Sequence, residues 1–231
     1  MHVPDGFLDA PTSLATAGVA GLAVAAALRG ARRELDDRSA PLAGLVAVFV
    51  FAAQMVNFPV GAGTSGHLMG GVLAAVLVGP WTATLSLTVV LMVQALAFAD
   101  GGLTALGTNV TLIAVVAVWV GYAVFRLVQR FAPRSRRLIP VAAAIGALVS
   151  VPAASVVFAG LWAVGGAAPI DLALLTTTMV GWHTLIGIGE AVITGLAVSA
   201  VLQARPDIVY AARHLGAARP LEVRTAAGAT S

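Results

Sequence analysis

The stretch LIPVAAAIGALVSVPAASVVFAGLWAV, residues 138–164, is long enough to cross a lipid bilayer and contains no charged residue. A transmembrane helix needs about 20 consecutive, predominantly apolar residues. Further apolar runs lie on both sides of this stretch, at residues 14–28, 41–55, 68–78, 81–98, 103–128 and 172–202. The sequence therefore predicts an all-α integral membrane protein with about seven transmembrane helices.

The composition of the whole chain supports this membrane fold. Hydrophobic residues make up 59% of the 231 residues and charged residues 10%, whereas soluble globular chains are about 25% charged. The chain has no cysteine, which excludes disulfides and thiolate metal sites. All 13 basic residues are arginines, so a lysine-containing phosphate-binding loop is excluded as well. Any ATP hydrolysis that drives this protein must come from another chain.

The positions of the arginines predict which side of the membrane each connection faces. The segment before the first apolar run carries no arginine, which argues against a cleaved signal peptide. Connections rich in arginine remain in the cytoplasm, so we expect an outside N-terminus and a cytoplasmic C-terminus. The arginines follow the first, fifth and seventh runs, at Arg29, Arg32, Arg33, Arg38, Arg126, Arg130, Arg134, Arg136, Arg137, Arg205, Arg213, Arg219 and Arg224.

The chain divides into two parts by composition. Residues 1–204 contain all the apolar runs and form the predicted transmembrane domain. Residues 205–231 are rich in alanine, glycine and arginine, and we expect a cytoplasmic tail that is disordered beyond Pro220. The net charge of +3 is explained by membrane topology, so no nucleic-acid partner is predicted.

The first two residues can chelate a metal ion together. The amine of Met1, the backbone nitrogen of His2 after loss of its proton, and the His2 imidazole close adjacent rings around one cation. With one further nitrogen this set suits square-planar Ni(II) or Cu(II), and imidazole also suits Co(II). The amine must be free of its formyl group to act as a ligand. The alternative is that His2 is a solvent-exposed residue with no ligand.

His67 is a candidate for the further nitrogen. It lies in GAGTSGHLMGG, residues 61–71, at the outer end of the third apolar run. The predicted topology puts this loop on the same side of the membrane as Met1 and His2. Glycines let the backbone approach a ligand closely. A single histidine in such a loop is more often structural, but two histidines on one face favour a metal site.

Three segments resemble the CbiM/NikM family of membrane proteins. MHVPDGFL at residues 1–8 is similar to the N-terminal signature of that family, and GTSGHL at residues 63–68 to its second signature. HTLIGIGEA at residues 183–191 resembles its last helix. The resemblance extends from Met1 to about Leu202 and includes the number of helices. Members are the substrate-capture (S) components of cobalt and nickel energy-coupling-factor (ECF) transporters in the plasma membrane of prokaryotes.

This resemblance implies a substrate, a ligand set and partners. The chain would capture Co²⁺ or Ni²⁺ in a square-planar site formed by the Met1 amine, the backbone nitrogen and side chain of His2, and the His67 side chain. No organic cofactor is implied. The partners would be a transmembrane coupling (T) component and two ATPase (A) subunits in the lipid bilayer, with a small accessory membrane protein as a further candidate.

Five further polar residues are predicted to position the site or to line the path of the ion: Asp5, Asn57, Ser65, His183 and Glu190. His183 and Glu190 are seven residues apart, which places them on one face of a helix about 10 Å apart. They either relay the ion inward or organise the site from below. The alternative is an interhelical polar contact, in which Glu190 is protonated or is paired with a threonine or Asn109.

Two other functions compete with this prediction. The first is a stand-alone metal permease or channel that needs no ATPase. The second is an intramembrane serine protease, because GTSG at residues 63–66 resembles the serine motif of rhomboid proteases. Ser65 would then be the nucleophile and His183 its base. The N-terminal octapeptide has no role in a protease, so the sequence favours a transporter component that is not an enzyme.

Overall fold

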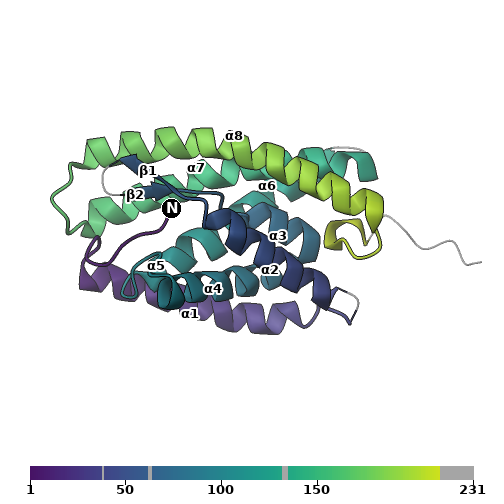
Figure 1. Cartoon of the computed structure of the whole chain (residues 1–231), viewed down its shortest axis with the longest axis horizontal. Helices are drawn as coiled ribbons and strands as arrows, with labels where there is room; N and C mark the ends of the chain where they lie inside the picture. The colour runs from purple at the N-terminus through teal and green to yellow at the C-terminus, as the bar shows by residue number, and fades with distance from the viewer. Residues whose placement is uncertain (38, 62–63, 132–134, 214–231) are drawn as a thin grey trace, which may run out of the picture.

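The computed structural model of the chain describes residues 1–37, 39–61, 64–131 and 135–213. The tail predicted to be disordered beyond Pro220 lies outside these residues, as do four of the arginines: Arg38, Arg134, Arg219 and Arg224. Within the described residues, the chain forms a bundle of helices with one short β-hairpin at one end (Figure 1).

Seven helical rods follow one another along the described chain. The first four are α1 (Ala10–Ala31), α2 (Ala40–Gln54), α3 (Gly71–Val78) and α4 (Pro80–Ala97). The fifth joins α5 (Leu106–Asn109), the π-helix η1 (Val110–Ala117) and α6 (Val118–Phe131) without a break. The sixth is the 3-10 turn η2 (Arg136–Leu138) continued by α7 (Ile139–Gly165). The seventh is α8 (Leu172–Ala204), which precedes the 3-10 turn η3 (Tyr210–Ala212).

Five of these rods are long and apolar enough to cross a membrane, namely α1, α4, α5–α6, η2–α7 and α8. Helix α2 has 15 residues and α3 has 8, so neither matches the usual length of a span. The outer faces of α1 and α8 expose leucines such as Leu14, Leu22 and Leu196, as expected for surfaces that face lipid. The chain is therefore a multi-pass membrane protein.

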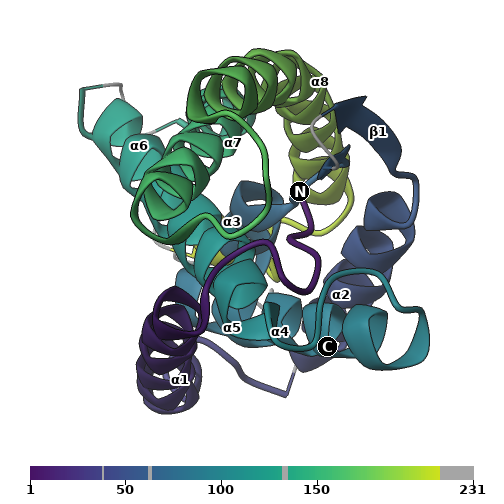
Figure 2. The same cartoon turned by 90° about the vertical axis from the view of Figure 1, so that its left-hand side faces the viewer.

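Helix α3 lies in the middle of the bundle. All eight of its residues are buried, and Figure 2 shows other helices around it. Small residues let the neighbouring helices approach closely. A Cβ atom at Gly121 would lie 2.1 Å from the Val72 side chain, and one at Gly107 would lie 2.4 Å from the Ala17 backbone. The third apolar run is shorter than a membrane span because it forms this short helix, which is buried inside the bundle.

A β-hairpin joins α2 to α3. Strand β1 (Phe58–Gly61) pairs antiparallel with β2 (Thr64–Gly66). Neither strand was expected from the sequence, because each has at most four residues and shows no alternating pattern. The hairpin matters because His67 follows β2 directly, at the end of the bundle that also holds the N-terminus (Figure 1).

The opposite end of the bundle, where α1, α6 and α8 finish, carries the described arginines. We call it the arginine end. Glu34 is buried there and accepts hydrogen bonds from the backbone nitrogens of Trp81 (3.2 Å) and Thr82 (2.7 Å) at the start of α4. Arg213 donates to the backbone oxygen of Glu34 (2.5 Å). The segment after α8 therefore folds back against the connection between α1 and α2.

Candidate metal centre

The segment before α1 turns back into the bundle. Its first three residues are each at most 5% exposed, and Figures 1 and 2 show the N-terminus surrounded by helices. The backbone nitrogen of Asp9 donates to the oxygen of Gly165 at the end of α7, and Leu8 forms a bridge with Gly166. These contacts fix the outer part of the segment, so Met1 is held at a defined depth.

Asn109 fixes the inner part of the same segment. Its Oδ1 accepts a hydrogen bond from the backbone nitrogen of Val3 (2.7 Å), and its Nδ2 donates to the Val3 oxygen (3.1 Å). The nitrogen of Gly102 donates to that oxygen as well (2.9 Å). A primary amide is the side chain that can supply one acceptor and one donor in this way. Residue 3 is thus held on both sides, and its orientation determines that of residues 1 and 2.

The loop between α4 and α5 closes over the N-terminal segment. A Cβ atom at Gly102 would lie 2.4 Å from the backbone nitrogen of Asp5, so only glycine fits there. Asp5 is exposed, and its Oδ1 accepts hydrogen bonds from the backbone nitrogen (2.8 Å) and hydroxyl (2.5 Å) of Thr104. The role of Asp5 in this structure is to join the segment to the loop.

His67 presents one particular nitrogen to the N-terminus. Its Nδ1 lies 2.7 Å from the backbone oxygen of Leu68. A carbonyl oxygen can only accept a hydrogen bond, so Nδ1 carries the proton and Nε2 keeps its lone pair. Nε2 is in contact with the amine of Met1, and both residues are at most 1% exposed. The structure therefore brings together two nitrogens that are 66 positions apart in the chain.

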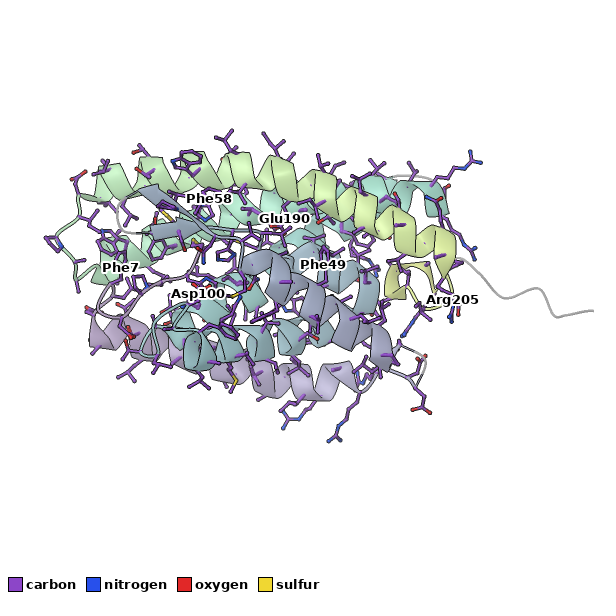
Figure 3. All side chains as sticks on the ribbon, viewed as in Figure 1. Phe7, Phe49, Phe58, Asp100, Glu190 and Arg205 are labelled. Carbon is purple, nitrogen blue, oxygen red and sulfur yellow. The ribbon has the colours of Figure 1, made fainter. Side chains whose placement is uncertain are left out.

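Glu190 on α8 holds the turn that follows His67. Its carboxylate accepts hydrogen bonds from the backbone nitrogens of Met69 (2.7 Å) and Gly70 (2.9 Å). Gln54 donates to the Met69 oxygen (2.9 Å), and Gly70 has a φ of 73°, which favours glycine. Figure 3 shows Glu190 nearer than Asp100 to the arginine end of the bundle. The carboxylate thus positions the backbone that carries His67.

Replacing Glu190 by glutamine is expected to weaken the site and the fold together. The Glu190→Gln side chain can accept one of the two backbone hydrogen bonds, and its own amide faces the other donor. Hydrogen bonds to charged groups contribute about 1.5–3 kcal/mol each, and loss of a group that supports a metal ligand lowers affinity about 10–100-fold. Thermal unfolding in detergent and metal titration measure the two effects.

Glu34→Gln is the matched control for this substitution. Glu34 is also a buried carboxylate that accepts two backbone hydrogen bonds, but it lies at the arginine end. The Glu34→Gln substitution is expected to lower the melting temperature while leaving the metal dissociation constant unchanged. If Glu190→Gln also left the dissociation constant unchanged and slowed transport alone, the carboxylate would act on the path of the ion and not on the position of His67.

The His2 ring lies against His67, against Gln94 of α4 and against Asp100 in the loop that follows α4. The two imidazoles stack with ring centroids 4.3 Å apart. His2 Nδ1 is 3.2 Å from Asp100 Oδ1, and His2 Nε2 is 3.2 Å from Gln94 Oε1. Each ring nitrogen thus faces an oxygen, but a neutral imidazole carries one proton and can donate to one of them. With the proton on Nε2 and donated to Gln94, Nδ1 keeps a lone pair that a cation can bind.

Burial keeps the nitrogens of the first two residues uncharged. Burial lowers the pKa of the Met1 amine to about 4, although the nearby Asp100 carboxylate raises it. Burial also lowers the pKa of His2, and the Asp100 carboxylate beside it offsets part of that effect. Both groups are therefore neutral at pH 7, with lone pairs available to a cation. Neutral amine and imidazole nitrogens are the donors that Ni(II) and Co(II) accept.

The nitrogens of Met1, His2 and His67 form one cluster, which we call the nitrogen cluster. Comparison with known proteins indicates what such a cluster serves. Residues 2–208 match the model of the CbiM family, described as the cobalt uptake substrate-specific transmembrane region. This chain belongs to the CbiM family. It is 33% identical to the fused nickel transport protein NikMN of Rhodobacter capsulatus, over 99% of this chain and 69% of that protein. It is 29% identical to the cobalt transport protein CbiM of Kyrpidia tusciae, over 93% and 88% of the two chains.

A crystal structure with the same fold agrees with the family assignment. That structure, described as a truncated transition metal transporter, superposes with a TM-score of 0.82 at 32% identity and covers 88% of this chain and 99% of its own. The chain is the substrate-specific transmembrane component of a cobalt or nickel ECF transporter. It is a transporter component and not an enzyme.

The remaining residues predicted for the site have different surroundings in the structure. Asn57 is exposed, and its Nδ2 donates to Asp100 Oδ2 (3.4 Å). Ser65 is half-buried on β2. His183 is fully buried on α8, with Nδ1 2.8 Å from the Met179 oxygen. The idea that Glu190 is paired with a threonine or Asn109 is wrong, because its hydrogen bonds go to the loop after His67.

The protease alternative fails on geometry in this CbiM-family chain. His183 Nδ1 is occupied by the Met179 oxygen, and its Nε2 has no hydrogen-bond partner among the described residues. Ser65 is one of those described residues. A serine nucleophile and its base must be within hydrogen-bond reach. The two residues therefore do not form a catalytic pair.

Three residues that touch the N-terminal segment were not predicted as site residues: Gln94, Asp100 and Asn109. Gln94 and Asn109 are amides inside apolar runs, and such residues usually join neighbouring helices. Asp100 offered one signal, since it is an acidic residue in a connection that has no arginine. Nothing in the local sequence connects any of the three with residues 1–3.

Proposed function

We propose that this CbiM-family chain captures Co²⁺ or Ni²⁺ with four nitrogens. These are the amine of Met1, the backbone nitrogen of His2, His2 Nδ1 and His67 Nε2. The contact between the Met1 amine and His67 Nε2 carries this proposal. It brings a buried amine against a buried imidazole nitrogen that keeps its lone pair, so two nitrogen donors lie close enough to bind one cation.

The covalent geometry of the first two residues supports planar binding. A five-membered ring closes from the Met1 amine to the His2 backbone nitrogen, and a six-membered ring from that nitrogen to His2 Nδ1. The backbone nitrogen loses its proton to water as the ion binds. His67 Nε2 supplies the fourth corner. Four nitrogens in a plane suit Ni(II), and the same donors bind Co(II) less tightly.

We further propose the orientation and the partners of the chain. Among the described residues, the end that holds Met1 carries no arginine and the arginines lie at the opposite end, which supports an outside N-terminus in a prokaryotic plasma membrane. Residues 1–204 are the metal-capture domain, and residues 205–231 form a cytoplasmic tail. A T component and two A subunits supply the energy, because this chain has no phosphate-binding loop. A small accessory membrane protein completes the assembly where one is encoded.

Metal uptake by cells tests this proposal. The chain is expressed in cells that lack their own cobalt and nickel importers, with and without the T and A subunits. Uptake of labelled Co²⁺ or Ni²⁺ is expected only with all subunits and is expected to stop when the A subunits carry an inactive ATPase site. Equal uptake by the chain alone would instead support a stand-alone permease.

A further inference from the structure

A cavity opens beside the proposed nitrogen ligands. It has a volume of about 490 Å³, and His2 forms part of its wall together with Asn57, Ser65 and Asp100. A water molecule occupies about 30 Å³ in the liquid. The cavity therefore has room for more than about ten waters and can take a cation that still carries its hydration shell. The nitrogen cluster alone has no such space, because Met1 and His67 are buried.

Asp100 supplies the charge of this cavity. Among the described lining residues it is the one with a formal charge at neutral pH. Its Oδ1 is 3.2 Å from His2 Nδ1, and its Oδ2 accepts a hydrogen bond from Asn57 (3.4 Å). The carboxylate therefore reaches from the cavity to the nitrogen that is proposed to bind the ion. Figure 3 shows Asp100 at the end of the bundle that holds the N-terminus.

The backbone around Asp100 is held in a restricted conformation. Ala99 has a φ of 52°, which only a few per cent of non-glycine residues adopt. The backbone nitrogen of Asp100 donates to the backbone oxygen of Gln94 (3.0 Å). Gly101 has a φ of 93°, and a Cβ atom there would lie 3.3 Å from the His2 ring. The loop thus places a carboxylate against His2 at a cost in backbone strain.

We propose that this cavity is a docking site for a hydrated divalent cation, which Asp100 holds through the water shell before the nitrogens replace the water. This inference rests on the proposed function, because it needs the nitrogen ligands as the destination. The ion moves by ligand exchange: water leaves, nitrogen lone pairs bind, and no oxidation occurs. After exchange the carboxylate remains beside His2 and offsets the buried positive charge.

This site has a kinetic consequence. A metal ion that exchanges its water slowly binds at a rate equal to the population of the hydrated encounter complex multiplied by its water-exchange rate. Asp100 raises that population by electrostatic attraction, which depends on the charge and size of the hydrated ion and falls with ionic strength. Hydrated Co²⁺ and Ni²⁺ have the same charge and nearly the same size. Loss of the carboxylate should therefore slow both ions by the same factor.

Rapid-mixing kinetics on the purified full chain with its native N-terminus test this proposal, with Co²⁺ and Ni²⁺ as probes. Asp100→Asn is expected to lower the association rate constant about 10-fold at low salt for both ions, within the range that steering by charge produces. Its rate should also depend much less on ionic strength. Asp100→Glu should restore the dependence on salt, because it restores the charge.

Asp171→Asn is the matched control. Asp171 is an exposed acid at the same end of the bundle, lies outside the cavity, and caps α8 by accepting from the Leu174 nitrogen (2.9 Å). Asparagine caps helices as well as aspartate does, so this variant should bind both ions at the wild-type rate.

Two outcomes separate this proposal from the proposed function. If Asp100→Asn kept the wild-type rate and salt dependence and lowered only the final affinity, Asp100 would merely position His2 and the docking site would be refuted. If instead His67→Gln bound metal as tightly as the wild type, the nitrogen ligands themselves would be wrong, and the docking site would lose its destination.

Discussion

A single residue added before Met1 is expected to lower metal affinity by at least about 1000-fold, which corresponds to about 4 kcal/mol. The addition converts the amine into a peptide amide and removes the neutral donor that lies against His67 Nε2. It also needs space where Met1 is completely buried. Isothermal titration with Ni²⁺ and with Co²⁺ measures the loss directly.

A removable extension gives the cleanest form of this experiment. The extension is designed so that a protease cuts immediately before Met1, and one preparation is titrated before and after cleavage. Mass spectrometry verifies that the cleaved chain begins with an unformylated methionine. The same residue added to the C-terminus is the control and should leave the affinity unchanged. Equal dissociation constants before and after cleavage would mean that the amine is not a ligand.

Replacing His67 by glutamine is expected to lower metal affinity by at least about 100-fold. Loss of a group that merely supports a metal ligand costs about 10–100-fold, and His67 Nε2 is proposed as a ligand itself. Glutamine has a similar size, so the hairpin and the bonds from Glu190 to Met69 and Gly70 should persist. Metal titration and circular dichroism together distinguish loss of a ligand from loss of the fold.

His183→Gln provides the comparison for that variant. His183 is also a buried imidazole, but its Nδ1 bonds to the Met179 oxygen one turn away on α8. It is not in the proposed ligand set, so the dissociation constant should change by less than about tenfold. Should His183→Gln cost as much affinity as His67→Gln, the ion would have to lie deeper in the bundle than proposed.

The long helices could be predicted from the sequence because each is a continuous apolar run. The predicted run at residues 172–202 corresponds to α8 (Leu172–Ala204), and the run at 138–164 corresponds to α7 (Ile139–Gly165). The hairpin could not be predicted in this way. Its two strands are short, and the glycines, threonine and serine around them also suit an irregular loop. Their pairing depends on the surrounding helices, which no local pattern reports.

The proposed ligands were accessible to sequence reasoning for a chemical reason. Met1 and His2 form a chelating unit through their covalent bonds alone, and His67 stands out as one of four histidines in the chain. Asp100 and Asn109 were not accessible in the same way. Their contacts with His2 and Val3 join positions about 100 residues apart, and they arise only when the N-terminal segment folds back into the bundle.

The structure of the metal-loaded protein tests the central proposal most directly. Crystals grown with Ni²⁺ and measured at the nickel absorption edge locate the ion by its anomalous scattering. We expect one strong peak within bonding distance of the Met1 amine, His2 Nδ1 and His67 Nε2, with the His2 backbone nitrogen in the same plane. A peak bound elsewhere, for example between His183 and Glu190, or a shell made of oxygen atoms, would contradict the four-nitrogen site.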